Sequence, residues 1–250
     1  MEVFNITLPT SWDELTDKQL LMVYHLFARD LSAAEVKTLC LMKWNGLKVL
    51  SQLPDKRFLT KRGKEVVPLS TRQIQQATSV LDFLDSFAPM PVRISRIDKY
   101  RALPADFEKV PFEQFLYLEN LFQGYLNIQS DELLLQMAQV LYASDHVKPD
   151  KAQLVGIFYW IASLKQYFAG LFSNFYKPAG ANSDDNLLGS GQPDIYRQLR
   201  DTTNAMIRAL TGGDITKEER IMKMDTWRAL TELDAKAREA EELRKAIKKP

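Results

Sequence analysis

Apolar residues recur every three or four positions along most of the chain, which places them on one face of an α-helix. Segment 149–176 has the clearest stripe, formed by Leu154, Ile157, Phe158, Ile161, Leu164, Phe168, Leu171, Phe172 and Phe175. Tyr159, Trp160 and Tyr167 occupy the other side of this segment, so we expect a helix buried on most faces. The pattern predicts a mainly α-helical protein.

Capping residues mark where several of these helices begin. Thr16 with Gln19, and Ser32 with Glu35, match the capping-box pattern S/T-x-x-E/Q. They predict a helix to about residue 29 and a second helix to residue 44, which Asn45-Gly46 ends. Further helices are expected after Ser70 and over residues 111–127, 130–144, 149–176, 193–210 and 216–248.

Short alternating stretches indicate a small β-sheet. Residues 2–8 place Phe4, Ile6 and Leu8 on one face, and residues 89–97 alternate in a similar way. Arg62-Gly63 lies between two apolar pairs and predicts a hairpin. We expect the two alternating stretches and the hairpin to form one accessory sheet.

Part of the sequence occurs twice. LPTSWDELTDKQLLMVYHLF at residues 8–27 is followed by LPADFEKVPFEQFLYLENLF at residues 103–122, and six of the twenty aligned positions are identical. Trp12 aligns with Phe107, and both rings are expected to fill a core beside the turn that enters the helix. We interpret the repeat as two related helical subdomains, although proline, an aromatic residue and a capped helix also form a common way to start a helix.

Residues 177–194 differ from the rest of the chain. They contain three glycines and two prolines, with almost no apolar periodicity, and predict a flexible linker. The expected organisation is a helical core with the internal repeat over residues 1–176, the linker, and a C-terminal helical arm over residues 195–250.

The composition excludes several classes of protein. The 250 residues are 46% hydrophobic and 26% charged, with a net charge of +1, which gives no electrostatic reason to expect nucleic acid or an anionic membrane as the main partner. Polar residues such as Lys165 interrupt segment 149–176, so we do not expect it to span a membrane. The single cysteine, Cys40, excludes an internal disulfide and is expected to be a buried, inert thiol. The N-terminus lacks a secretion signal, which favours a reducing cytoplasm.

No residues assemble into a recognisable catalytic, cofactor or metal site. His25 and His146 are far apart in the sequence, without a neighbouring histidine or cysteine. Gly63-Lys64 and the pair Gly189 and Gly191 lack the remaining positions of nucleotide-binding motifs. Two pairs of acids, Asp82 with Asp85 and Asp184 with Asp185, are typical of solvated surface. We therefore expect no enzyme, no cofactor, no metal and no small-molecule substrate.

The hairpin region is strongly basic and suggests an alternative. Its cations within residues 56–64 are Lys56, Arg57, Lys61, Arg62 and Lys64, and Arg93, Arg96, Lys99 and Arg101 would lie nearby if the predicted sheet formed. This cluster could contact phosphates in a nucleic-acid-binding accessory factor. A charged edge that blocks aggregation of strands is the favoured explanation, because interleaved exposed aromatic residues are missing.

The C-terminal arm carries a narrow apolar seam with four-three spacing: Thr226, Leu230, Leu233, Ala237, Ala240, Arg244 and Ile247. Acid-first i, i+4 pairs, such as Glu241 with Lys245, support an exposed helix. The candidate partner-binding residues are Trp227, Leu230, Leu233, Ala237 and Ala240, with Trp227 and Leu230 as the anchoring end. Alternatively, the arm is a solvated helix that packs only through Met224, Trp227 and Leu230.

Three stretches, LPTSWDELTDKQLL, FYWIASLKQYFAGLFSNFY and DTWRALTELDAKAREAEE, resemble helical proteins encoded in the tail-gene region of phages and prophages of Bacteroidetes-type gut bacteria. The resemblance covers most of the chain, and the terminal phrase with Trp227 is its most specific part. It implies a tail assembly chaperone or minor tail component in the bacterial host cytoplasm or the virion, with the tape-measure protein or a second copy as partner. No functional residues are carried over from it.

Overall fold

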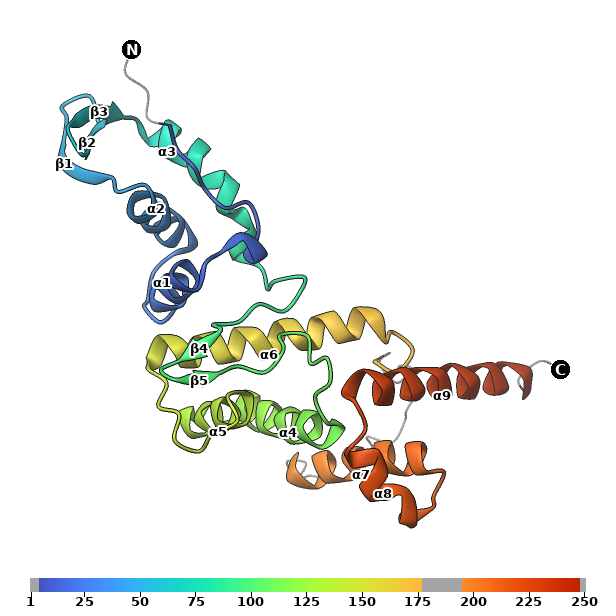
Figure 1. Ribbon diagram of the computed structural model, residues 1–250. Helices are drawn as coiled ribbons and strands as arrows, with labels where there is room; N and C mark the ends of the chain where they lie inside the picture. Colours follow the sequence, from blue (N-terminus) through green and yellow to red (C-terminus); the bar gives the residue numbers. More distant parts are fainter. Residues whose placement is uncertain (1–4, 177–194, 248–250) are drawn as a thin grey trace, which may run out of the picture. The chain divides into compact units, whose positions relative to one another are not determined.

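The computed structural model describes residues 5–176 and 195–247 and confirms a mainly α-helical protein (Figure 1). The linker predicted for 177–194 lies outside the described residues. Contacts divide the chain into two compact units: unit 1 holds residues 1–95 and 149–163, and unit 2 holds residues 96–148 and 164–250. Each unit contains one copy of the repeat.

The helices of unit 1 begin where the capping residues predict. They are α1 (Asp17–Phe27), α2 (Ala33–Trp44) and α3 (Thr71–Thr78), with the 3-10 turns η1 (Trp12–Glu14) and η2 (Ser79–Asp85). Thr16, Ser32 and Ser70 each cap a helix in a reciprocal capping box. Gly46 follows α2 with a φ of 63°, a left-handed conformation that glycine adopts without strain.

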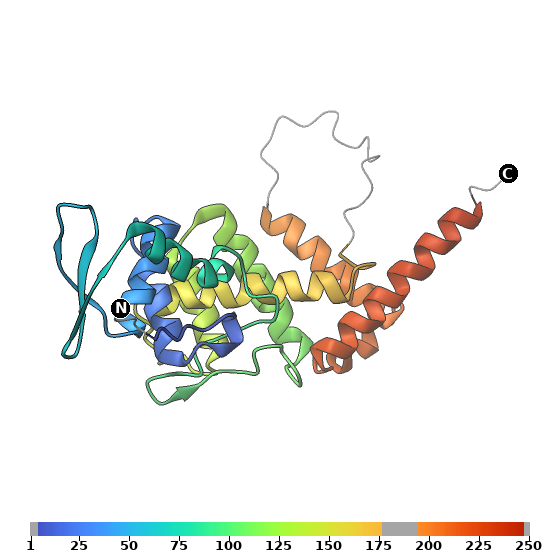
Figure 2. The ribbon, with the colours of Figure 1, turned by 90° about the horizontal axis from the view of Figure 1, so that it is seen from above.

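A three-stranded antiparallel sheet lies at one end of unit 1, beyond α2 and α3 (Figures 1 and 2). Its strands are β1 (Lys48–Gln52), β2 (Phe58–Arg62) and β3 (Glu65–Leu69), with β2 in the centre. Arg62 pairs with Glu65 across the turn, and Gly63 has a φ of 59°, which confirms the predicted hairpin. The sequence did not predict β1.

The predicted composition of this sheet is wrong. Residues 5–8 form no strand, because side chains satisfy their backbone: Thr7 N donates to Asn45 Oδ1 at 3.2 Å, and Asn5 O accepts from Arg62. Of residues 89–97 only β4 (Arg96–Ile97) is a strand, and it pairs with β5 (Tyr100–Arg101) in a separate two-stranded sheet. Two short alternating segments did not determine which strands would pair.

Aromatic rings fill the core of unit 1. The Trp12 side chain is buried, and its Nε1 donates to Phe83 O at 2.9 Å and to Ser86 O at 3.1 Å. Its ring lies beside Tyr24 and beside Tyr159 of α6 (Lys151–Leu171), with centroids 6.5 and 6.3 Å away. The first part of α6 therefore completes this core.

Unit 2 contains α4 (Phe112–Ile128), α5 (Asp131–Leu141), the remainder of α6, α7 (Ile195–Thr211), η3 (Ile215–Lys217), α8 (Glu218–Met222) and α9 (Thr226–Ile247). A single helix over 216–248 was predicted, and this is wrong, because the chain leaves the helical path after α8. There Met224 O accepts from Phe112 N at 2.8 Å, and Thr226 N donates to Val110 O at 2.9 Å. These bonds to a distant segment replace the helical ones.

In both copies of the repeat, the turn before the helix contains the same backbone hydrogen bond. Leu15 N donates to Trp12 O, and at the matched position Val110 N donates to Phe107 O, both at 3.2 Å. Phe107 is buried, as is Trp12, which confirms both rings as core residues. The copies differ at the cap, because Pro111 stands where Thr16 caps α1 and has no N–H for a capping glutamine to accept.

Candidate partner-binding site

The first half of α9 belongs to the core of unit 2. Leu230 and Leu233 are buried. The Trp227 ring lies 5.7 Å from Phe168 and 5.9 Å from Phe172, and its Nε1 donates to Asp106 O at 2.8 Å. The chain itself therefore covers the end of the arm that was expected to anchor a partner.

Asp234 fastens α9 to the segment that follows α6. Its carboxylate accepts hydrogen bonds from Asn174 N at 2.8 Å, Asn174 Nδ2 at 2.9 Å and Phe175 N at 3.0 Å. Burial opposes the charged form, but these hydrogen bonds outweigh it and lower the pKa of Asp234. Because the pKa is lowered on folding, the stabilisation is present above the ordinary pKa of an aspartate and is lost as the pH falls through the folded value.

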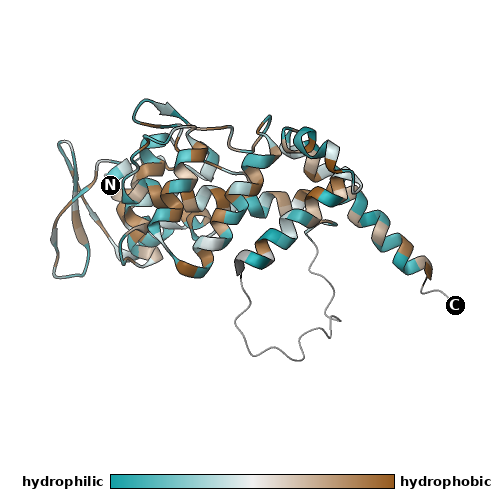
Figure 3. Ribbon diagram, turned by 90° about the horizontal axis from the view of Figure 1, so that it is seen from below, coloured by the Kyte–Doolittle hydropathy of each residue, from teal (hydrophilic) through white to brown (hydrophobic). Residues whose placement is uncertain are grey.

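The second half of α9 is uncovered. In Figures 1 and 2 it extends beyond the other helices of unit 2, and Figure 3 shows hydrophobic and hydrophilic segments alternating to its end. Ala237 is half-buried and Ala240 is exposed, while Leu243 and Ile247 are 65% and 82% exposed. At 100° per residue, these four side chains fall within one third of the helix circumference.

Ion pairs between neighbouring turns of the arm stabilise its helical conformation. Lys236 pairs with Glu232 at 3.5 Å, and Lys245 pairs with Glu241 at 2.8 Å, each at i, i+4 spacing. The apolar stripe therefore continues from the buried core onto a helix whose outer turns expose it. The candidate residues fall into two groups: Trp227, Leu230 and Leu233 pack inside the unit, whereas Ala237 and Ala240 lie where the stripe emerges.

Leu243 was missed among the candidate residues, although its sequence position identifies it. It follows Ala240 by three residues and precedes Ile247 by four, so it extends the same stripe. The strict four-three spacing of the predicted seam placed Arg244 there instead. Which half of the stripe is buried could not be read from the sequence, because both halves have the same periodicity.

Two arginines of the basic hairpin contact nearby acidic side chains or backbone oxygens. Arg57 pairs with Asp55 at 2.6 Å, and Arg62 donates to Asn5 O at 2.8 Å and lies 3.4 Å from Glu65. The sheet that would have brought Arg96 and Arg101 beside the hairpin does not form, since these residues belong to β4 and β5.

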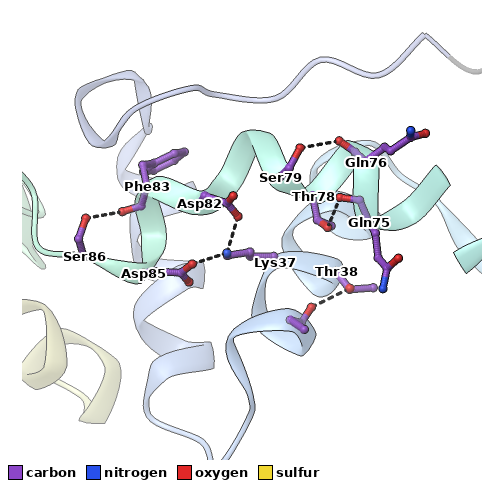
Figure 4. A network of polar contacts seen from close by, with 11 residues as sticks. Lys37, Thr38, Gln75, Gln76, Thr78, Ser79, Asp82, Phe83, Asp85 and Ser86 are labelled. Atoms are coloured by element: carbon purple, nitrogen blue, oxygen red, sulfur yellow. Dashed lines mark hydrogen bonds and ion pairs between the residues drawn. The ribbon is translucent and has the colours of Figure 1, made fainter. Parts of the chain in front are cut away.

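Asp82 and Asp85 are exposed, as predicted for solvated carboxylates, but they also share a partner that was not predicted. Both accept hydrogen bonds from Lys37 Nζ, at 2.6 and 2.5 Å (Figure 4). Burial of Lys37 opposes its charge, but the two carboxylates outweigh this and raise the pKa of its ammonium group. The lysine joins α2 to η2 within unit 1. No local sequence pattern predicts this contact, because the partners are 45 and 48 residues apart.

The remaining candidates for chemistry are dispersed. His25 and His146 are exposed. Cys40 is buried, as predicted, and its burial raises the thiol pKa to about 12, which favours an inert thiol. Among residues 5–176 and 195–247, no three or more side chains of His, Cys, Asp or Glu are grouped to hold a metal ion. Within the same residues, no helix is long and apolar enough to cross a membrane.

Comparisons with protein-family models, curated proteins and solved structures gave no match.

Proposed function

We propose that this protein is a non-enzymatic assembly protein that binds a helix of another protein through the exposed half of α9. This surface consists of Ala237, Ala240, Leu243 and Ile247, all exposed except the half-buried Ala237, and we call it the arm stripe. One observation carries the proposal: the apolar face of α9 is buried at Leu230 and Leu233 and continues into the arm stripe, where Leu243 and Ile247 are exposed. Large apolar side chains that are exposed in a row are typical of helix-binding surfaces.

The composition of the arm stripe suits a partner that must later be released. Its two alanines allow close approach of another helix, while its two large side chains supply little apolar area. An individual contact is therefore weak, and several copies on one long chain would bind through avidity while each copy exchanges rapidly.

The resemblance to phage tail-region proteins supplies the proposed partner. A tape-measure protein is a long, helix-rich chain that must stay soluble until tube subunits surround it. We propose that this protein is a chaperone-like helper of such a chain in the cytoplasm of the bacterial host. The helical architecture and the arm stripe support the proposal.

Substitutions on the arm stripe test this function without disturbing the core. Leu243→Gln together with Ile247→Gln removes the exposed apolar surface and keeps residues with good helix propensity. When the variant is co-expressed with the tape-measure protein of the same phage or prophage, we expect less soluble tape-measure protein than with the wild type. The measurement is the soluble fraction of the partner and its co-purification with the helper.

The control variant carries Arg238→Gln together with Glu242→Gln, which lie on the opposite side of α9 and leave the net charge unchanged. It should keep the partner soluble. Deletion of residues 226–250 is unsuitable, because it removes Trp227, Leu230 and Leu233 from the core. If the stripe variant keeps the partner as soluble as the wild type does, the arm is not the binding surface.

A further inference from the structure

Unit 1 contains a groove between α1 and α2 that the proposed function does not use. It has a volume of about 630 Å³. Its floor is apolar and is formed by Leu21, Met22, Leu26 and Leu39, of which only Leu26 is fully buried. The other three side chains remain partly accessible, so the groove offers apolar area to a ligand.

The rim of this groove is entirely basic. Lys18, His25 and Arg29 line the α1 side, and Lys43 lines the α2 side. All four side chains are exposed, and no aspartate or glutamate is among the lining residues. No ion pair between described residues involves Lys18, Arg29 or Lys43. An apolar floor with an unneutralised basic rim favours a ligand that is apolar on one side and acidic along its flanks.

The distribution of the charges indicates the shape of that ligand. Lys18 lies in the first turn of α1, and Arg29 follows beyond the end of the helix, so the whole length of α1 separates these two charges. A single phosphate or lipid headgroup concentrates its charge at one point and would need cations that converge on it. Cations spread along both walls instead match charges that are spaced along an elongated partner, as they are on an amphipathic helix.

We propose that the groove between α1 and α2 binds an amphipathic helix of a partner protein that has acidic residues on both sides of its apolar stripe. The apolar stripe lies on Leu21, Met22 and Leu39, and its acidic flanks face Arg29 and Lys43. This site lies in unit 1 and does not depend on the arm stripe, so the two proposals succeed or fail separately.

Designed peptides test the site directly. The first is an amphipathic helix of about 18 residues, or roughly five turns, with a leucine stripe and glutamate flanks. The second has the same stripe with lysine flanks, and the third has glutamate flanks with serine in place of leucine. Fluorescence anisotropy with the full-length protein should show binding of the first peptide alone, and the affinity should weaken as ionic strength rises.

Charge reversal on the rim supplies the matched comparison. Arg29→Glu together with Lys43→Glu should weaken binding of the first peptide roughly tenfold, because attraction becomes repulsion at two exposed positions. Lys61→Glu together with Lys64→Glu, on exposed residues of the hairpin region, changes the net charge equally and should alter the affinity by less than about twofold. Circular dichroism should show both variants folded, because all four side chains are exposed.

Three results would overturn the proposal. Equal binding of the glutamate-flanked and lysine-flanked peptides would show that the groove does not recognise the charge of its ligand. Binding to phosphatidylglycerol vesicles that is lost in the rim variant, without peptide binding, would assign the groove to an anionic membrane surface. Self-association in sedimentation velocity that is lost in the rim variant would assign it to a second copy of this chain.

Discussion

Position 156 has no room for a side chain larger than that of glycine, because the Tyr24 ring lies against it. A Cβ atom at this position would lie 2.8 Å from Cδ2 and 2.9 Å from Cε2 of Tyr24. The Tyr24 ring is buried among Trp12, Phe27 and Tyr159, so it has little room to move. Glycine at this point of α6 therefore allows the helix to approach α1 closely, despite its poor helix propensity.

Two alanine substitutions in the same helix should have opposite effects. Gly156→Ala should lower the free energy of unfolding by about 1–3 kcal/mol, because the added methyl group overlaps the Tyr24 ring. Gly170→Ala should raise it by about 0.5–1 kcal/mol, because a Cβ there meets nothing within 4 Å and alanine favours the helix. Urea denaturation of both variants measures the difference. A stabilising effect of Gly156→Ala would contradict the close packing.

At the scale of the element, the sequence predicted the features that depend on residues close together in the chain. The boxes at Thr16 and Ser32 each join residues three positions apart, and both helices begin there. The break between α8 and α9 depends instead on bonds from Met224 and Thr226 to residues near 111, which no local pattern reveals. The same limit applies to the ion pairs of Lys37, since they join distant segments.

The β-strands show this limit most clearly. The hairpin at Gly63 was predicted, because its turn and both strands are adjacent in the sequence. The third strand of that sheet is β1, which is exposed along its whole length and has no alternation of buried and exposed residues to detect. The alternation in residues 5–8 was real, but backbone groups there bond to Asn45 and Arg62.

The two halves of α9 should respond differently to the same substitution. Leu230→Ala should lower the free energy of unfolding by about 3 kcal/mol, because Leu230 is fully buried in unit 2. Leu243→Ala should change it by less than about 0.5 kcal/mol, because Leu243 is 65% exposed. Urea denaturation of the two variants checks both values. A large loss of stability in Leu243→Ala would show that the outer half of the arm is also part of the core.

At the scale of the whole molecule, each unit contains one copy of the repeat, which forms a turn and the helix that follows it. Both units also draw on α6, whose residues 151–163 belong to unit 1 and whose residues 164–171 belong to unit 2. Neither unit is therefore a continuous stretch of sequence. The repeat suggested two related helical subdomains, and it did not reveal that a later helix would contribute to both cores.

This organisation predicts that residues 1–95 cannot fold alone. Their core requires residues 149–163, since Tyr159 stacks on Phe27 with centroids 5.0 Å apart and Gly156 lies against Tyr24. The isolated fragment should give a poorly dispersed amide NMR spectrum and no cooperative thermal transition. Addition of a synthetic peptide of residues 149–163 should restore dispersion, with a midpoint that rises with peptide concentration.

A peptide with Gly156→Leu serves as the control, because its side chain would overlap the Tyr24 ring and should prevent assembly. Cooperative folding of the fragment without any peptide would show that unit 1 is independent of α6. Equal rescue by both peptides would show instead that any apolar helix can complete the core. Rescue by the natural peptide alone would establish that the contact between Gly156 and Tyr24 specifies how α6 joins the first copy of the repeat.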